Sequence, residues 1–121
     1  MEVLAARVLI RPIDMGRSVA FYRDELGLAI AREFPGGTVF FLGGGFLELS
    51  GAADAPAGAA VALWLQVRDL DAAHRELAAR VTREPRREPW GLREMWLADP
   101  DGTRIVLVEV PPEHPLRRDP R

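Results

Sequence analysis

The sequence contains no cysteine and no lysine, and only two of its 121 residues are histidine. The lack of cysteine excludes disulfide bonds, thiolate metal sites and a cysteine nucleophile together. The 16 basic residues, all of them arginine, are balanced by 18 acidic residues, which gives a net charge of −2. This balance provides no electrostatic footprint for nucleic acid, so we expect no nucleic-acid partner.

Long apolar runs are also absent, although 48% of the residues are apolar. No run approaches the length of a membrane span, and the first eight residues do not form a signal peptide. We therefore expect a cytoplasmic protein with no membrane partner. The length and the apolar content are sufficient for one domain with a compact core.

The stretch from Asp14 to Leu28 predicts a helix that directly follows a strand. The apolar run 8–10 precedes it, and the Asp14 carboxylate can accept hydrogen bonds from the first helical turn. Gly27 is the glycine expected where the helix ends. Apolar residues recur at helical spacing between these ends, at Met15, Val19, Tyr22 and Leu26. This segment is one strand–helix unit that needs a sheet to cover its apolar face.

A second strand–helix unit has the same order of elements. The apolar run 63–67 leads into Asp69, which is again a helix cap, and the predicted helix continues to Val81. Its apolar face consists of Leu70, Ala73, Leu77 and Val81. We interpret the two units as an internal duplication, with a chance resemblance between two such units as the alternative.

Strands and turns complete two modules of order βαβββ. In the first module we predict strands over 3–13, 28–34, 38–42 and 46–50. In the second we predict a helix over 69–81 and strands over 61–67, 92–98 and 103–110. The charged run 82–89 is interpreted as a strand or loop at a solvated edge. A single domain (1–110) then contains modules over about 3–50 and 61–110, a small-residue linker over 51–60, and a loose Pro- and Arg-rich tail over 111–121.

Two motifs resemble those of the vicinal oxygen chelate superfamily, which includes glyoxalase I, extradiol dioxygenases and the fosfomycin and bleomycin resistance proteins. SVAFYRDELGL (18–28) is similar to its first-helix motif, and WGLREMWLADPDGTRIVLVE (90–109) to its closing hairpin. The likeness covers Arg7 to Val110 and points to the bleomycin-resistance-like branch. It implies an α+β fold in which duplicated βαβββ modules form curved mixed sheets around a cavity.

The resemblance also implies where a metal would bind. Metal enzymes of the superfamily carry one ligand on the first strand and one on the fourth strand of each module. The corresponding positions in this sequence are Arg7, Glu48, Ala62 and Val106. Only Glu48 could bind a metal, whereas stable divalent sites need three or four protein ligands in most cases. We therefore expect no metal and no cofactor.

Strand alternation extends the predicted site, because side chains two residues apart share one face of a sheet. The predicted ligand-binding residues are Arg7, Arg11, Phe46, Glu48, Trp64, Gln66, Glu94, Trp96 and Arg104, together with Trp90 as a lid in the turn before its strand. Such a set suits a planar, polar organic ligand that stacks on indoles and is oriented by charges. Alternatively, Arg7 and Glu48 form a structural ion pair and the tryptophans only fill space.

The two histidines do not point to catalysis. His74 is expected to pack on a helix face, and His114 to be solvated in the tail. No general acid stands near Glu48 in the pattern, and no phosphate-binding loop precedes a helix.

Two functions therefore remain open. The first is a metal-independent binding protein that sequesters a planar or aromatic polar compound, with antibiotics among the candidates. The second is a lyase, isomerase or dioxygenase-like enzyme of the same superfamily that uses Glu48 as a base or a metal ligand. The three missing ligand positions favour binding without catalysis. Because facing modules in this superfamily often come from different subunits, we also predict a homodimer.

Overall fold

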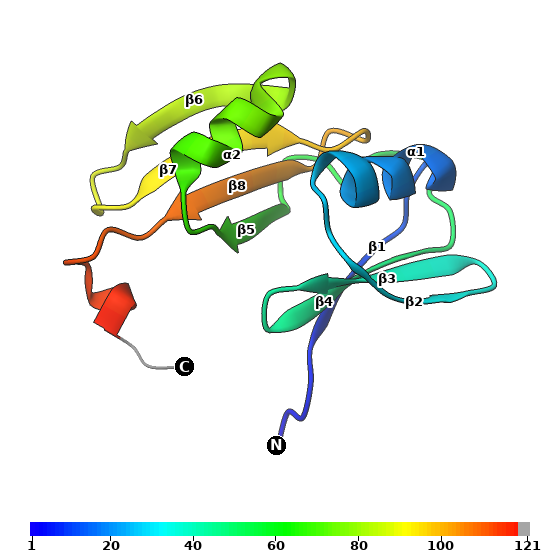
Figure 1. Cartoon of the computed structure of the whole chain (residues 1–121). Helices are drawn as coiled ribbons and strands as arrows, with labels where there is room; N and C mark the ends of the chain where they lie inside the picture. Colours follow the sequence, from blue (N-terminus) through cyan, green and yellow to red (C-terminus); the bar gives the residue numbers. More distant parts are fainter. Residues whose placement is uncertain (119–121) are drawn as a thin grey trace. The chain divides into compact units, whose positions relative to one another are not determined.

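The computed structural model describes residues 1–118, and the chain divides into two compact units, with the boundary between Pro56 and Ala57. This boundary falls within the predicted linker, and residues 51–61 contain no helix or strand. Each unit contains one four-stranded mixed sheet and one α-helix (Figure 1).

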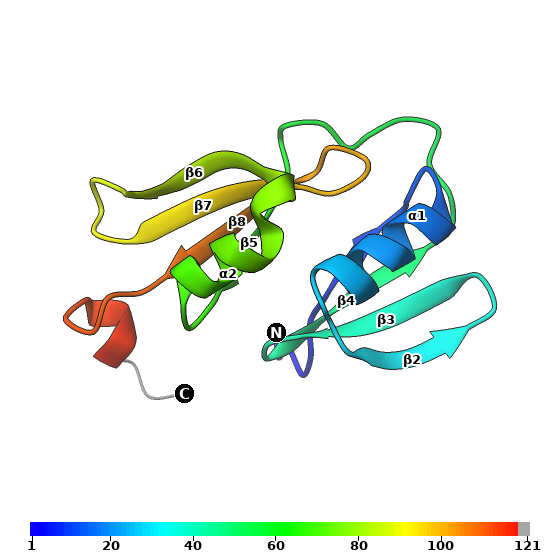
Figure 2. The same ribbon diagram turned by 45° about the horizontal axis from the view of Figure 1, so that its top comes forward.

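The first unit is a βαβββ module. Its elements are β1 (Arg7–Ile10), α1 (Met15–Ala20), a π-helical turn (Phe21–Glu25), β2 (Ile30–Phe34), β3 (Gly37–Leu42) and β4 (Gly45–Ser50). The strand order is β1-β4-β3-β2, with β1 parallel to β4 and the other pairs antiparallel. In Figure 2 the helix α1 lies over this sheet, beside β4.

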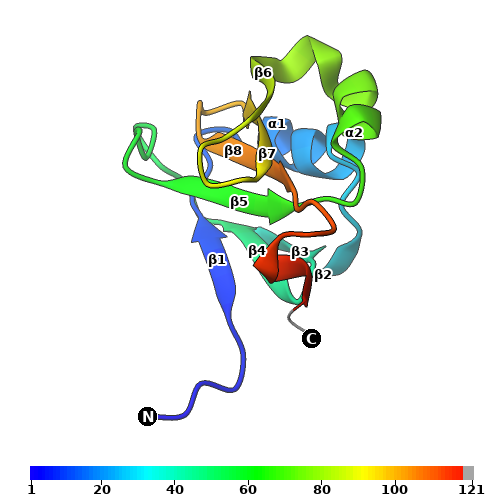
Figure 3. The ribbon, with the colours of Figure 1, turned by 90° about the vertical axis from the view of Figure 1, so that its left-hand side faces the viewer.

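The first strand is shorter than predicted, because the interval 3–13 is a strand only from Arg7 to Ile10. It pairs with β4 only from Phe46 to Leu49, one residue short of each end of that strand. Residues before Arg7 therefore have no strand to pair with, and Pro12 has no N–H with which to extend the ladder. In Figure 3 the first six residues lead into β1 without regular structure.

The first helix begins as predicted but changes geometry before its end. Asp14 caps it, accepting a hydrogen bond from the Arg17 backbone N–H at 3.0 Å. From Phe21 onward the helix widens, and the Leu26 N–H donates to the Phe21 carbonyl at 2.9 Å. Gly27 then adopts a φ of 73°, as the predicted terminating glycine requires.

The core of the first unit lies between α1 and its sheet. Phe21 and Tyr22 from the π-helical turn are fully buried, as are Phe40, Leu47 and Leu49 from the strands, and the Tyr22 and Phe40 ring centroids lie 6.3 Å apart. The Phe21 and Tyr22 rings pack edge to face with their centroids 5.0 Å apart. The α1 side of this sheet is therefore the apolar side. Side chains alternate between the two faces along a strand, so Arg7 and Glu48 lie on the other face.

The second unit repeats this plan. Its elements are β5 (Ala62–Gln66), α2 (Leu70–Leu77), a 3₁₀ turn (Ala78–Arg80), β6 (Val81–Arg87), β7 (Arg93–Ala98), β8 (Arg104–Glu109) and a terminal 3₁₀ turn (Pro115–Arg118). The strand order β5-β8-β7-β6 matches that of the first unit, which confirms the predicted α+β fold of duplicated βαβββ modules. The core consists of Leu70, Leu77, Met95, Leu97, Ile105 and Leu107.

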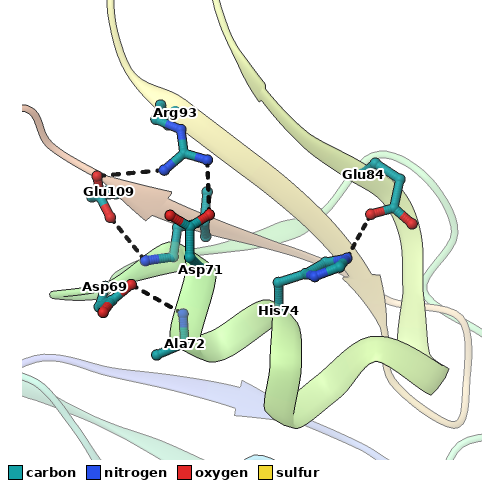
Figure 4. Close-up of polar contacts among 8 residues, drawn as sticks. Asp69, Asp71, Ala72, His74, Glu84, Arg93 and Glu109 are labelled. Atoms are coloured by element: carbon teal, nitrogen blue, oxygen red, sulfur yellow. Dashed lines mark hydrogen bonds and ion pairs between the residues drawn. The ribbon is translucent and has the colours of Figure 1, made fainter.

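The start of α2 is held by two carboxylates. Asp69 accepts from the Ala72 N–H at 3.0 Å, and Glu109 at the end of β8 accepts from the Leu70 N–H at 2.9 Å (Figure 4). Arg93 links Glu109 to Asp71, at 3.6 Å and 3.1 Å respectively. These bonds satisfy free N–H groups of the first helical turn and fix α2 onto its sheet.

His74, expected on the packed side of α2, is half-buried and lies 2.6 Å from the Glu84 carboxylate on β6. Figure 4 shows the ring pointing from the helix toward that strand. It therefore joins helix to sheet, on the side of the sheet that α2 covers.

The charged run 82–89 follows its prediction of a strand or loop at a solvated edge, with one exception. It forms most of the edge strand β6, but Glu88 is buried at 4% exposure rather than solvated. The β6–β7 register shifts between Arg83 and Arg86, which turns this part of the strand toward the sheet. Within residues 1–118, no helix is long and apolar enough to cross a membrane.

Candidate ligand-binding faces

Each sheet has one face covered by its helix and one face turned away from it. We call the sides turned away from the helices the Glu48 face in the first unit and the Trp96 face in the second. Strand register shows which residues share them: Glu48 lies between Leu9 and Val39 in one row, and Trp96 lies between Val106 and Arg83 in another. All predicted site residues on strands fall on these two faces.

Arg7 and Glu48 form an ion pair on the Glu48 face. The guanidinium Nη1 lies 2.6 Å from Glu48 Oε1, and the Ser50 hydroxyl donates to Oε2 at 2.8 Å. The Glu48 side chain is only 14% exposed. Hydrogen bonds from Arg7 and then from Ser50 lower the pKa of Glu48 below its ordinary value. Glu48 is therefore held as a carboxylate whose two oxygens already accept hydrogen bonds.

Aromatic rings adjoin this pair. The Arg7 guanidinium lies 5.8 Å from the centroid of the Phe46 ring, which in turn lies 5.7 Å from that of Phe41. Arg11 is exposed beyond the end of β1, and its guanidinium packs beside Gly51. The structure therefore brings together Arg7, Phe46 and Glu48, while Arg11 makes no ion pair with Glu48 in the described part of the chain.

The four positions that the family resemblance assigned to metal ligands do not provide a metal site. Glu48 is engaged by Arg7 and Ser50, and Ala62 and Val106 have no donor atoms. Within residues 1–118, no cluster of three or more His, Cys, Asp or Glu side chains could hold a metal ion. This set of side chains does not fit the ligand requirements of a divalent metal.

Trp96 is the centre of the second face. The guanidinium carbons of Arg83 and Arg104 lie 3.9 Å and 4.0 Å from the centroid of its ring. Arg83 is on β6 and Arg104 on β8, and these strands flank β7 on opposite sides. The indole is thus stacked with guanidinium groups that reach it from both neighbouring strands, an arrangement stabilised by cation–π attraction.

Glu88 neutralises the β6 side of this cluster. Its carboxylate forms ion pairs with Arg83 and, at 3.2 Å, with Arg86. Burial by itself would raise the pKa of Glu88, but hydrogen bonds from Arg83 and Arg86 outweigh it, so the pKa is lowered. Arg83, Arg86 and Glu88 were not among the predicted site residues. Alternation along β6 could have identified Arg83 from its pairing with Trp96, but the bulge at Arg83–Arg86 is not evident from the sequence.

Trp90 and Glu94 form a separate pair at the β6–β7 turn. The Trp90 Nε1–H donates to Glu94 Oε2 at 2.8 Å, and Glu94 is 6% exposed, whereas Trp90 is 58% exposed. The tail holds this turn, because His114 Nε2 lies 3.1 Å from the Trp90 carbonyl. His114 Nδ1 accepts from the Leu116 N–H, so Nε2 is the donor. His114, expected to be solvated, is therefore half-buried and hydrogen-bonded, while the last three residues of the predicted tail lie outside the described residues.

Trp64 and Gln66 lie on the outer strand β5 and are both exposed, Trp64 at 50%. Trp64 is in the same row as Trp96, with Val106 between them. Farther along the face, Val108 is fully buried with Leu92 and Val110. The exposed Trp64 indole therefore lies next to the apolar residue Val106, and the stack of Trp96 with its two arginines lies on the far side of Val106.

Two N–H groups in the stack have no acceptor. Trp96 Nε1 and Arg83 Nε are buried, and no hydrogen-bond partner for either lies in the part of the chain that the structure describes. Arg104 is exposed, and among the same residues no carboxylate forms an ion pair with it. The Trp96 face therefore has a surplus of hydrogen-bond donors and of positive charge.

Comparison with known structures supports the fold. A protein of unknown function from Agrobacterium tumefaciens str. C58 is 27% identical, with a TM-score of 0.72 over 92% of this chain and 95% of that one. A glyoxalase/bleomycin resistance protein/dioxygenase from Nocardioides is 21% identical, with a TM-score of 0.78 over 95% and 89%.

A lactoylglutathione lyase from Agrobacterium tumefaciens is 22% identical, with a TM-score of 0.66 over 90% of this chain and 94% of that one. No curated protein sequence matches the chain. The model of one protein family matches residues 5–107, which include every strand and helix of both modules up to β8. The chain therefore belongs to the Glyoxalase/Bleomycin resistance protein/Dioxygenase superfamily.

Proposed function

We propose that this protein binds a planar aromatic compound without a metal and without catalysing its conversion, as a sequestering protein of the bleomycin-resistance-like type. The observation that carries the proposal is the exposed Trp64 indole on the Trp96 face, with one strand between it and Trp96, whose ring is stacked with two arginines. An exposed indole on a rigid strand offers a flat apolar surface, and the neighbouring polar groups can orient a ligand.

Trp64 is the better stacking surface of the two predicted indoles. Trp96 already has guanidinium groups about 4 Å from its ring centre on both neighbouring strands, whereas Trp64 is half exposed. In this proposal Trp64 contacts the aromatic body of the ligand, Gln66 lies beside it, and Trp96 positions Arg83 and Arg104. Trp90 is placed as a lid, because it is exposed at the turn and held by Glu94.

The enzymatic alternative would need Glu48 as a base or a metal ligand. The hydrogen bonds from Arg7 and Ser50 lower its pKa, and a lower pKa makes a carboxylate a weaker base. The same bonds occupy the oxygens that would otherwise bind a metal or accept a proton. These features favour a structural role for the pair and support binding as the function.

The test is a titration with a panel of planar aromatic compounds, bleomycin among them, followed by tryptophan fluorescence. Trp64→Leu should weaken binding by about 1–3 kcal/mol, taking base–aromatic stacking as the nearest measured case, or roughly ten- to a hundredfold. Val61→Ala is the matched control, because Val61 is 48% exposed directly before β5 and alternation directs it to the other side.

Binding that is lost in Trp64→Leu and kept in Val61→Ala supports the proposal. The proposal is wrong if no compound of the panel alters fluorescence or thermal stability at millimolar concentration. Turnover of any bound compound would instead support the enzymatic alternative.

A further inference from the structure

The charges on the Trp96 face do not cancel. Three arginines, Arg83, Arg86 and Arg104, share it with two carboxylates, Glu88 and Glu94. Glu88 pairs with both Arg83 and Arg86, and Glu94 accepts the Trp90 indole N–H. Arg104 remains without a carboxylate partner among the described residues. One positive charge on this face is therefore available to a ligand.

The unpaired donors lie in the same place as the unpaired charge. Trp96 Nε1 and Arg83 Nε are buried and lack acceptors in the described part of the chain. Both belong to side chains in the stack that includes Arg104, since each guanidinium carbon is within about 4 Å of the Trp96 ring centre. Buried N–H groups almost always have a partner, so two buried donors without acceptors in the described part of the chain, next to the unpaired Arg104, indicate an external acceptor.

The acceptor must bring negative charge and several lone pairs but no donor. A carboxylate meets these conditions, because its two oxygens match the planar fork of a guanidinium and can also accept from a neighbouring N–H. A neutral amide offers one acceptor and adds donors, and a cation would be repelled by Arg104. A carboxylate is also planar, as are the stacked indole and guanidinium groups beside it.

The position of Trp64 specifies the rest of the molecule. It lies in the same row as Trp96, with one strand between them, and two strand spacings amount to about 10 Å. An acid group at Arg104 and an aromatic ring on Trp64 would therefore belong to one small ligand. We infer that the compound bound by this protein is an aromatic carboxylate, with its acid group held by Arg104 and the Trp96 indole N–H. This inference rests on the proposed function.

The test uses the three indole N–H signals of the ¹⁵N-labelled full-length protein, one for each tryptophan. Trp64→Phe, Trp90→Phe and Trp96→Phe assign them. The probes are 1-naphthoate and 1-naphthamide, which share the ring and differ in the acid group. We expect 1-naphthoate to shift the Trp96 indole signal and to bind at least about tenfold more tightly than the amide, because charged hydrogen bonds are roughly twice as strong as neutral ones.

Arg104→Gln tests the charge directly. It should weaken binding of 1-naphthoate by about tenfold and leave binding of 1-naphthamide nearly unchanged. Arg75→Gln is the matched control, because Arg75 is an exposed arginine of α2, the helix on the other side of the sheet. Arg75→Gln should bind both probes like the unaltered protein.

The possible results separate the inference from the proposed function. Equal affinity for acid and amide, with no effect of Arg104→Gln, would overturn the carboxylate assignment and leave aromatic binding at Trp64 standing. Binding of 1-naphthoate without a shift of the Trp96 signal would overturn it as well. If neither probe binds at millimolar concentration and the aromatic panel also fails, the proposed function falls and the inference falls with it.

Discussion

The Arg7 guanidinium on β1 lies 2.6 Å from the Glu48 carboxylate on β4, and these are two of the positions that the family resemblance assigned to metal ligands. In this pair the positive charge that neutralises the Glu48 carboxylate comes from Arg7. In a metal site, that positive charge would come from the metal ion. Ser50 completes the arrangement with a hydrogen bond to the second carboxylate oxygen.

This pair makes stability depend on pH. Because the pKa of Glu48 is lowered in the folded protein, its contribution is fully present above the ordinary value of 4.5 and is lost as the pH falls through the lowered folded value. Glu48→Gln should therefore be less stable than the unaltered protein at pH 7, and the difference should shrink in acid. Urea unfolding followed by circular dichroism across this range measures it.

Glu33→Gln is the control for this comparison, since Glu33 is an exposed carboxylate on β2 of the same unit. At every pH, Glu33→Gln should differ less in stability from the unaltered protein than Glu48→Gln does at pH 7. A difference for Glu48→Gln that stays constant between pH 7 and acid would contradict the linkage.

The second prediction concerns metal content. The side chains at Arg7, Ala62 and Val106 supply no metal ligands, so the purified protein should retain no stoichiometric Ni, Zn, Mn or Fe after dialysis. Elemental analysis that finds about one ion per chain would be incompatible with this expectation. Lactoylglutathione lyase activity should be absent for the same reason.

The fold was predictable because its signals are local. Asp14 and Asp69 were recognisable as helix caps, and residues 90–109 resembled a closing hairpin; in the structure Asp99, between the two strands of this hairpin, accepts from the N–H groups of Asp101 and Thr103. The repeated order of these elements was enough to predict two βαβββ modules. Alternation also placed Glu94 and Trp96 on one face of β7, and the residues that alternate with them, Met95 and Leu97, are fully buried.

The parts that were not predicted depend on contacts between distant residues. The burial of Glu88 follows from a register shift in β6 and from two arginines, neither of which alternation indicates. The π-helical turn at Phe21–Glu25 and the contact of His114 with the Trp90 carbonyl likewise depend on tertiary packing. The ligand-binding role of the ten predicted residues stays a prediction.

The third prediction tests the cap of α2. Asp69→Ala removes the side chain that accepts from the Ala72 N–H, so it should destabilise the protein by about 0.5–2 kcal/mol. Glu76→Ala, at an exposed position on the same helix, is the control and should change stability by less than about 0.5 kcal/mol. Thermal unfolding followed by circular dichroism measures both. Equal effects of the two substitutions would show that Glu109 alone is sufficient to hold the helix start.

The fourth prediction is that the protein is a homodimer. The strand β1 is at the edge of its sheet, and Leu9 and Val8 on it are 61% and 39% exposed. An exposed apolar edge strand is normally covered or protected. Light scattering at micromolar concentration should give twice the chain mass, and Leu9→Lys should shift the protein toward the monomer. A monomer at every concentration would count against this assignment.

The last prediction concerns Glu88, whose carboxylate holds Arg83 and Arg86. Glu88→Gln removes the charge and leaves the Arg83 guanidinium, only 18% exposed, without its counter-ion. Uncompensated buried charge is strongly unfavourable, whereas exposed pairs contribute little. Glu84→Gln is the matched control on β6, because the Glu84 carboxylate also contacts another side chain, that of His74, but is 75% exposed.

We therefore expect Glu88→Gln to lower the melting temperature at pH 7 at least about twice as much as Glu84→Gln. Since the pKa of Glu88 is lowered, its stabilising effect should be complete above the ordinary value of 4.5 and should disappear as the pH falls below it. Arg83→Met combined with Glu88→Gln should recover part of the loss, because the double substitution leaves no unpaired charge at Arg83. A double variant less stable than the sum of the two single effects would mean that the loss has another origin, such as collapse of the Trp96 stack.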